Sequence, residues 1–262
     1  VDDGAGLKLV TSSGAQSLTL TNPNKLEFNA YNLGFDGVID NISFIPTNVD
    51  GSVTTFYDQT GNGNDATNST ESEQPLVVSG GTLVTENGKA AIQFDGVDDT
   101  FDSASFLNAL DDASIINVSS PIATNAFSNI YSGFDSFIYF NIIFRYNDDG
   151  KLIVSLSGLS ANGSYSTSTS YAAQQNLIFM NFDNSLTSGN QVDIHLNGSD
   201  ANASGSNDVG TLKSPTNGYI GSRDGANNFN GNMQELIIFN SEQSANRTGM
   251  ETNINDHFDI YT

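Results

Sequence analysis

The sequence predicts an all-β protein, and three features of its pattern carry that prediction. Apolar and polar residues alternate within short segments, which is the two-residue period of a half-buried strand. Clusters of Gly, Asn, Ser and Asp separate these segments at short, regular spacing, as turns separate strands. Convincing helical periodicity is nearly absent from the 262 residues. Strands spaced in this way favour a β-sandwich or a β-barrel.

The clearest single element is a hairpin in the middle of the chain. Residues 137–146 and 152–157 read as strands, and residues 147–151 (NDDGK) lie between them. The Asp-Gly pair in this segment is typical of a tight turn, because positive φ angles cost little there. We therefore expect two strands joined by this turn.

The last third of the chain contains two further strands and the one helix candidate. Val192–Leu196 alternates, and residues 233–239 (MQELIIF) form the strongest late strand. In residues 244–258 apolar residues recur every four positions, which predicts one face of a helix. The residues of this stripe are Met250, Ile254 and Phe258.

The composition excludes several classes of function. Eight Lys and Arg against thirty Asp and Glu give a formal net charge of −22. Such a surface repels nucleic-acid phosphates and anionic membranes, so we expect neither partner. No window approaches the eighteen apolar residues of a membrane span. Without cysteine there is no disulfide or thiolate site, and His195 and His257 alone argue against a zinc centre.

The beginning of the chain differs from the rest. FDGVIDNISF at residues 35–44 aligns with FNGNMQELII at residues 229–238, and the second copy lies where a domain would end. We therefore expect residues 1–50 to be strands of a preceding β-domain or an N-terminal extension. Residues 51–262 are expected to form the main domain. About fifty residues are too few for a sandwich of their own.

Several motifs of the main domain resemble a known family. YDQTGNGNDA at residues 57–66 is followed by Gln74-Pro75 and by ENGKAAIQFDGVDD at residues 86–99. GYIGS at residues 218–222 and FNGNMQELIIF at residues 229–239 resemble the closing strands of the same family. These motifs are similar to those of laminin-G-like (concanavalin A-like) jelly-roll domains of phage and bacterial surface proteins. The resemblance implies a two-sheet antiparallel jelly-roll sandwich.

The first of these motifs also resembles the catalytic domain of fungal-type arabinofuranosidases. That resemblance implies Asp224 as the position of the acid catalyst. The family's nucleophile is a glutamate on a strand without a counterpart here, since Glu235 lies in the closing strand, and the family's cysteine pair is missing. We therefore expect no catalytic residues and no enzymatic activity, with a glycoside hydrolase of the arabinofuranosidase type as an alternative.

Residues 58–65, which follow a strand-like segment at residues 53–56, predict either a self-closed turn or a cation site. Oxygen ligands of the kind that Ca²⁺ prefers come from Asp58, Asn62, Asn64 and Asp65. In the alternative, Asp and Asn side chains bond their own backbone while the glycines take positive φ angles. A second acidic cluster, Asp95, Asp98 and Asp99, leaves the same alternatives open.

A glycan site is expected to combine exposed aromatic rings with amide and carboxylate groups, because sugars present apolar faces beside hydroxyl groups. Three polar loops have this chemistry. Their candidate glycan-binding residues are Tyr165, Tyr171, Arg223, Asp224, Asn227 and Asn228. In the alternative, the tyrosines pack on the sheet and the asparagines close turns.

Together these features predict a carbohydrate-binding or adhesion module without enzymatic activity. We expect it outside the cell, on a virion as a fibre, spike or decoration domain, or on a bacterial surface. The expected partners are cell-surface glycans or polysaccharide and neighbouring subunits of the virion or appendage, including copies of this chain. Ca²⁺ is the one cofactor that the residues suggest. A purely structural domain without a ligand is the alternative function.

Overall fold

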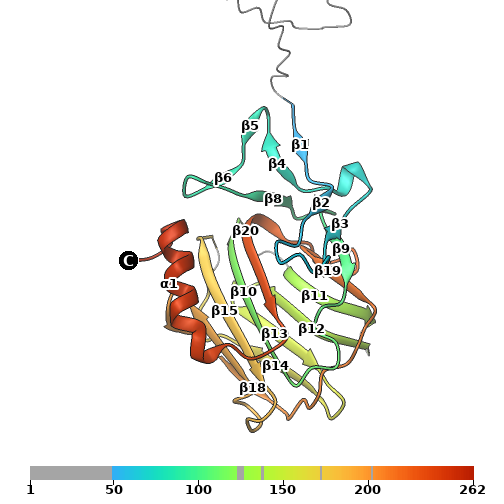
Figure 1. Ribbon diagram of the computed structural model, residues 1–262, viewed down its shortest axis with the longest axis vertical. Coiled ribbons are helices and arrows are strands. Elements are labelled where there is room, and N and C mark those ends of the chain that lie inside the picture. Colours follow the sequence, from blue (N-terminus) through green and yellow to red (C-terminus); the bar gives the residue numbers. More distant parts are fainter. Residues whose placement is uncertain (1–48, 123–126, 137–138, 172, 202) are drawn as a thin grey trace, which may run out of the picture. The chain divides into compact units, whose positions relative to one another are not determined.

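The computed structural model describes residues 49–122, 127–136, 139–171, 173–201 and 203–262. The chain divides into two units, residues 1–45 and residues 46–262. Because the described residues begin at residue 49, the predicted segment of residues 1–50 lies outside them except for its last two positions. The described residues form two antiparallel β-sheets that pack face to face (Figure 1). The predicted all-β, two-sheet antiparallel sandwich is confirmed.

The first sheet, called sheet I here, has nine strands in the spatial order β1-β4-β8-β20-β10-β15-β16-β17, with β5 paired to β4. Two ten-residue strands, β10 and β20, run side by side in its centre and pair antiparallel. The strands are β1 (Gly51–Ser52), β4 (Leu76–Ser79), β5 (Thr82–Leu83), β8 (Ile92–Asp95), β10 (Asp112–Pro121), β15 (Asn176–Asp183), β16 (Val192–Leu196), β17 (Ser199–Asp200) and β20 (Asn230–Phe239).

The second sheet, sheet II, also has nine strands, in the order β18-β14-β13-β12-β11-β19-β9-β3-β2. Its strands are β2 (Thr55–Phe56), β3 (Ala66–Thr67), β9 (Phe101–Ala104), β11 (Ser128–Ser136), β12 (Tyr139–Tyr146), β13 (Leu152–Ser157), β14 (Asn162–Ser166), β18 (Ser204–Ser206) and β19 (Asn217–Ile220). A separate hairpin joins β6 (Thr85–Glu86) to β7 (Lys89–Ala90).

The core lies between the two sheets because apolar residues alternate along their strands. In β13, Leu152, Val154 and Leu156 are fully buried, whereas Ile153 and Ser155 are half-buried on the outer face. Fully buried aromatic residues fill much of the core. Because each aromatic ring buries a large apolar area, few of them suffice for a chain of low apolar content.

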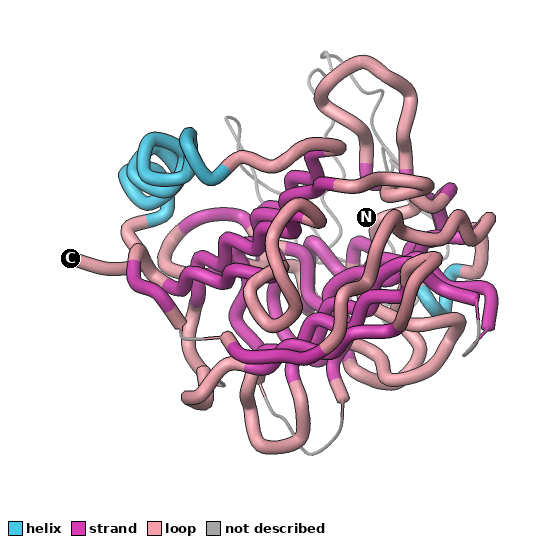
Figure 2. Tube along the Cα trace, turned by 90° about the horizontal axis from the view of Figure 1, so that it is seen from below, coloured by secondary structure: helices cyan, strands magenta, loops and turns pink. Residues whose placement is uncertain are grey.

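One helix, α1 (Arg247–Phe258), covers part of the outer face of sheet I (Figures 1 and 2). Its residues Ile254 and Phe258 pack with Ile116 of β10 and Phe179 of β15. Short 3-10 helices, η1 (Glu71–Glu73) and η2 (Ser244–Asn246), complete the described helices. None of the helices in these residues has the length and apolar character needed to cross a membrane.

Most elements predicted from the pattern are present. The hairpin is β12–β13, with Gly150 in its turn at a φ angle of 77°, and the predicted strand Val192–Leu196 is β16. Residues 233–239 lie in β20, and residues 244–258 form η2 and α1.

The predicted strand at residues 53–56 is wrong as a single element. Ser52 pairs with Leu76 in sheet I, whereas Thr55 pairs with Thr67 in sheet II. The chain therefore crosses from one sheet to the other at residues 53–54. A run of four apolar and β-branched residues does not reveal such a crossing, because either sheet can accept each residue.

Candidate functional site on the outer face of sheet II

Four of the six candidate glycan-binding residues lie in one loop, residues 223–228, between β19 and β20. Arg223 and Ala226 exchange two backbone hydrogen bonds, of 2.9 and 3.0 Å. Between them Asp224 and Gly225 take positive φ angles of 52° and 70°. Two consecutive positive φ angles match the tight turn that Asp-Gly favours. The loop therefore presents its side chains from a fixed backbone.

Hydrogen bonds from β11 hold this loop and its approach against the outer face of sheet II. The backbone N–H of Asn129 donates to the Asn227 carbonyl oxygen at 3.0 Å, and the Asn129 side-chain amide donates to the same oxygen at 2.7 Å. The hydroxyl of Ser132 donates to the carbonyl oxygen of Ser222 at 2.9 Å. At the far end of the loop the Asn228 amide donates to the carbonyl oxygen of Val97.

Under the loop lies a cluster of apolar residues, which we call the outer-face cluster. It consists of Phe134, Phe140, Ile143 and Tyr219. The first three are buried, and Tyr219 is partly exposed. The guanidinium carbon of Arg223 lies 5.4 Å from the centroid of the Phe134 ring, within the range of a cation–π contact. The cluster therefore supports one partly exposed aromatic ring beside one guanidinium.

Carboxylates also lie beside Tyr219. The Tyr219 hydroxyl donates to the Asp224 Oδ1 atom at 3.1 Å, and Asp102 is the cross-strand partner of Tyr219. Burial, this hydrogen bond and the charges of Asp224, Asp102 and Asp135 raise the pKa of Tyr219 to about 12. Burial and the charges of Glu73 and Asp224 raise the pKa of Asp102. The site thus offers carboxylate acceptors and a guanidinium close to one partly exposed aromatic ring.

The two predicted tyrosines lie elsewhere. Tyr165 is fully buried, because β14 alternates and turns Tyr165 toward the core, where its ring lies against Gly205. The alternative that it packs within the sheet is the arrangement found, and Tyr165 leaves the candidate set. Tyr171 is half-buried and packs against the main core, while its carbonyl oxygen accepts a hydrogen bond of 2.7 Å from Asn176.

Residues 58–65 form a turn whose own donors occupy the carboxylate of Asp58. Its Oδ1 atom accepts from the backbone N–H and the hydroxyl of Thr60, at 2.8 and 2.6 Å, and its Oδ2 atom accepts from the Asn64 N–H at 3.0 Å. The Asp65 Oδ1 atom accepts from the Asp58 N–H at 2.8 Å. The Asn62 amide donates to the Thr60 hydroxyl at 2.8 Å. The hydrogen bonds to its carboxylate, first from the Thr60 hydroxyl and then from the backbone N–H groups of Asn64 and Thr60, lower the pKa of Asp58 to about 2.

The second acidic cluster is also a hydrogen-bonded turn. Oxygens of Asp95, Asp98 and Asp99 lie within 4.8 Å of one another. The Asp95 Oδ1 atom accepts from the Val97 N–H at 2.7 Å, and the Asp99 Oδ2 atom accepts from the Asp95 N–H at 2.8 Å. Asp99 is buried, with 5% of its surface exposed. Burial and then the neighbouring charges raise its pKa from 3.8 to about 6.

This raised pKa predicts a pH-dependent stability. The folded protein binds the proton of Asp99 more tightly than the unfolded chain, so the stabilisation is complete below pH 3.8 and is lost as the pH rises through about 6. We expect Asp99→Asn to remove this loss. Relative to wild type, its free energy of unfolding should gain about 1–2 kcal/mol between about pH 4 and about pH 7, measured by urea denaturation.

Asp256→Asn provides the control, because Asp256 is an exposed carboxylate on α1. Its difference from wild type should stay constant over the same range. A constant difference for Asp99→Asn would contradict the prediction.

Asp224 and Glu235 are the two carboxylates considered because of the resemblance to arabinofuranosidases. They lie on opposite faces of the sandwich. Asp224 is bonded to Tyr219 over sheet II. Glu235 is in β20 on the outer face of sheet I, two residues from Ile237, which packs with the α1 cluster. Burial raises the pKa of Glu235, and the charge of His257 in α1 lowers it. A glycosidase needs two carboxyl groups within about 10 Å on one site, so these two cannot act as a pair.

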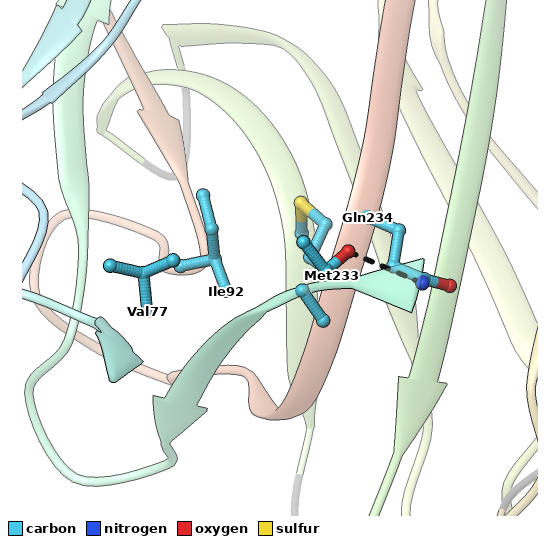
Figure 3. Close-up of a pocket in the computed structure, with 6 residues that line it drawn as sticks. Val77, Ile92, Met233 and Gln234 are labelled. Carbon is cyan, nitrogen blue, oxygen red and sulfur yellow. Dashed lines mark hydrogen bonds between the residues drawn. The ribbon is translucent and has the colours of Figure 1, made fainter. Parts of the chain in front are cut away.

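A small apolar pocket lies away from this loop, between β4, β8 and β20 (Figure 3). Its lining residues are Val77, Ala90, Ala91, Ile92, Met233 and Gln234. The amide of Gln234 donates to the carbonyl oxygens of Glu86 at 3.0 Å and Ala90 at 3.3 Å. The one polar side chain of the lining is therefore used within the protein, and the pocket lacks polar groups that converge on a ligand.

Comparison with known proteins extends the description. No protein-family model matches the sequence, and no curated protein matches it. The binding domain of Paraclostridial mosquitocidal protein 1 superposes with a TM-score of 0.55 at 11% identity, over 76% of this chain and 49% of that one. This chain thus spans about half of that structure. The likeness is one of fold.

Two further solved structures are less similar. The heptameric SAP-like pentraxin of Limulus polyphemus has a TM-score of 0.45 at 15% identity, over 63% of this chain and 82% of that one. The CBM40 domain of the Ruminococcus gnavus sialidase, bound to α2,6-sialyllactose, has a TM-score of 0.48 at 14% identity, over 63% and 97%. These two likenesses, like the first, are of fold alone. Membership of the laminin-G-like family stays a prediction.

Proposed function

We propose that this chain is a carbohydrate-binding or adhesion module without catalytic activity. One observation carries the proposal: a partly exposed Tyr219 ring, bonded to an exposed Asp224 carboxylate and flanked by Arg223, lies on the outer face of a rigid sheet. Aromatic rings suit the apolar face of a sugar, and carboxylates and guanidinium groups suit its hydroxyl groups. Loops on a fixed sandwich are where binding functions concentrate.

The proposed location is the outside of a virion or of a bacterial cell. The net charge of −22 supports an exposed and soluble appendage. Cell-surface glycans or polysaccharide are the proposed ligands, and neighbouring subunits of the same appendage, including copies of this chain, are the proposed protein partners. A purely structural domain is the competing proposal. Absence of binding to every glycan of an array, together with a stable oligomer in light scattering, would favour the structural domain.

The central test is a glycan array on wild type, Tyr219→Ala and Tyr57→Ala. Tyr57 is the matched control, because it is 66% exposed and follows the edge strand β2, outside the 223–228 loop. We expect Tyr219→Ala to weaken binding about tenfold, which corresponds to about 1.4 kcal/mol, and Tyr57→Ala to bind as wild type does. Circular dichroism checks that both variants fold. Unchanged binding by Tyr219→Ala would place the ligand elsewhere.

The same glycan array also tests whether binding depends on calcium. The proposal for Asp58, Asn62, Asn64 and Asp65 predicts that EDTA weakens glycan binding and that added Ca²⁺ restores it. Their hydrogen bonds support the self-closed turn, because both oxygens of Asp58 already accept donors. Binding that is indifferent to EDTA would therefore remove calcium from the proposed function and leave the glycan site intact.

A further inference from the structure

Arg145 is a half-buried cation without an acidic partner in the described part of the chain. It lies on the outer face of sheet II, in β12, and its guanidinium carbon is 4.0 Å from the centroid of the Phe127 ring. Its Nε atom is buried without a hydrogen-bond partner. Lys151, His195 and Arg247, by contrast, each form an ion pair with an acidic side chain. Burial of a guanidinium without an anion destabilises a fold. No ion pair of Arg145 in the described residues offsets this cost.

The fold brings a second guanidinium to the same place. Asn129 is the cross-strand partner of Arg145, and it is the residue that anchors the 223–228 loop through Asn227. Arg223 exchanges backbone hydrogen bonds with Ala226, whose carbonyl oxygen accepts a hydrogen bond of 3.5 Å from the same Asn129 amide, so the Arg223 backbone lies close to this pair of strands. Burial and the charge of Arg223 both lower the pKa of Arg145. The charge of Asp224 acts on Arg223 in the opposite sense, so the need for an anion is greatest at Arg145. An anion bound at Arg145 would relieve the repulsion from Arg223.

The surrounding groups favour a sugar acid over a highly charged anion. Asp224 and Asp102 lie beside Tyr219 and repel further negative charge, but they can accept hydrogen bonds from sugar hydroxyl groups. The rings of Tyr219 and Phe127 are both partly exposed and offer apolar contact. The planar fork of a guanidinium matches a carboxylate, which it can bind through two parallel hydrogen bonds.

We propose that Arg145 and Arg223 together bind the carboxylate group of an acidic saccharide, while its hydroxyl groups face Asp224 and Asp102. The proposal rests on the function proposed above, because it names the class of glycan that the same site takes. It makes Arg145 a binding residue. The carboxylate can belong to a nonulosonic acid, as in sialyllactose, or to a hexuronic acid, as in oligogalacturonate.

The test is isothermal titration of the whole chain with four probes: 3′-sialyllactose, trigalacturonate, lactose and 3′-sulfolactose. Lactose is the neutral match of sialyllactose, and sulfolactose carries a charge without a carboxylate. We expect at least one of the two carboxylate ligands to bind at least tenfold more tightly than lactose and sulfolactose. The carboxylate ligand that binds identifies the type of sugar acid.

Three variants connect this preference to the arginines. Arg145→Gln and Arg223→Gln should each reduce the carboxylate ligand to the affinity of lactose. Arg145→Lys should keep part of the preference, because it retains the charge without the fork, and it covers the case in which Arg145→Gln fails to fold. Lys89→Gln removes an exposed positive charge from β7 and should leave the preference unchanged.

The outcomes separate the two proposals. Equal affinity for lactose and the carboxylate ligands, or a preference that survives Arg145→Gln, overturns the arginine proposal and leaves a neutral-glycan module standing. Equal affinity for sulfolactose and sialyllactose overturns the proposed preference for a carboxylate and leaves a general anion site. Absence of binding to all four probes and to the whole glycan array overturns the carbohydrate-binding function itself, and the arginine proposal with it.

Discussion

Replacing Phe94 with alanine is expected to lower the free energy of unfolding by about 3–5 kcal/mol. Phe94 is 1% exposed and lies in β8 of sheet I. Its ring meets Phe101 of sheet II edge-on, with centroids 6.0 Å apart at 86°, and meets Phe229 in the same way at 5.8 Å and 84°. The substitution removes a ring that joins the two sheets and leaves a cavity that the neighbours cannot fill.

Urea denaturation followed by circular dichroism measures this loss. Tyr57→Ala is the control, because it removes an aromatic ring that is 66% exposed and should change the free energy of unfolding by less than about 0.5 kcal/mol. A loss below about 1 kcal/mol for Phe94→Ala would contradict the packing described for the core, since full burial of such a ring is worth more than that.

Gly221→Ala is expected to destabilise the fold by about 3 kcal/mol or more, from two separate causes. Gly221 has a φ angle of 83°, which alanine adopts only with strain. In addition, an added Cβ atom would lie 2.3 Å from the Cε1 atom of Phe94. Because Gly221 closes β19 and leads into the 223–228 loop, the same change is expected to weaken glycan binding.

Gly225→Ala separates the two causes. Gly225 has a similar φ angle of 70°, but an added Cβ atom meets no other atom within 4 Å. It should therefore show only the backbone cost, of about 1–2 kcal/mol. The double variant Phe94→Ala/Gly221→Ala should lose about 1–3 kcal/mol less than the sum of its single changes, because the cavity accepts the new methyl group. Strict additivity would show that Gly221 and Phe94 do not touch.

The fold was accessible from the sequence because sheets are encoded locally by alternation and turn residues. Val192–Leu196 matches β16 at both ends, since each of its apolar residues faces the core. Residues 53–56 failed for the opposite reason. Their pattern is satisfied by either sheet, and the choice of sheet depends on partners such as Leu76 and Thr67, which lie far along the chain.

Only part of the candidate site could be predicted from the sequence. The 223–228 loop is a local feature, and its polar composition identified four of its residues. The polar composition of residues 162–166 is typical of a loop and predicted an exposed Tyr165, whereas the segment forms β14, whose alternation turns Tyr165 inward. Tyr219, Phe134 and Arg145 were missed because strand register brings them together, and one sequence does not encode register visibly. Arg145 did have a signal in the sequence, because it is a rare cation within a mostly apolar strand.

The helix α1 makes the sandwich directional. It seals Ile116 and Phe179 on one flank, whereas the loop on the opposite flank keeps Tyr219 and Arg223 within reach of solvent. A bare sandwich with two equivalent flanks could crosslink two glycan chains by itself. Under the proposed function each chain would present one glycan site, so firm attachment to a glycan-coated surface would require several copies that point the same way, and avidity would then depend on their spacing.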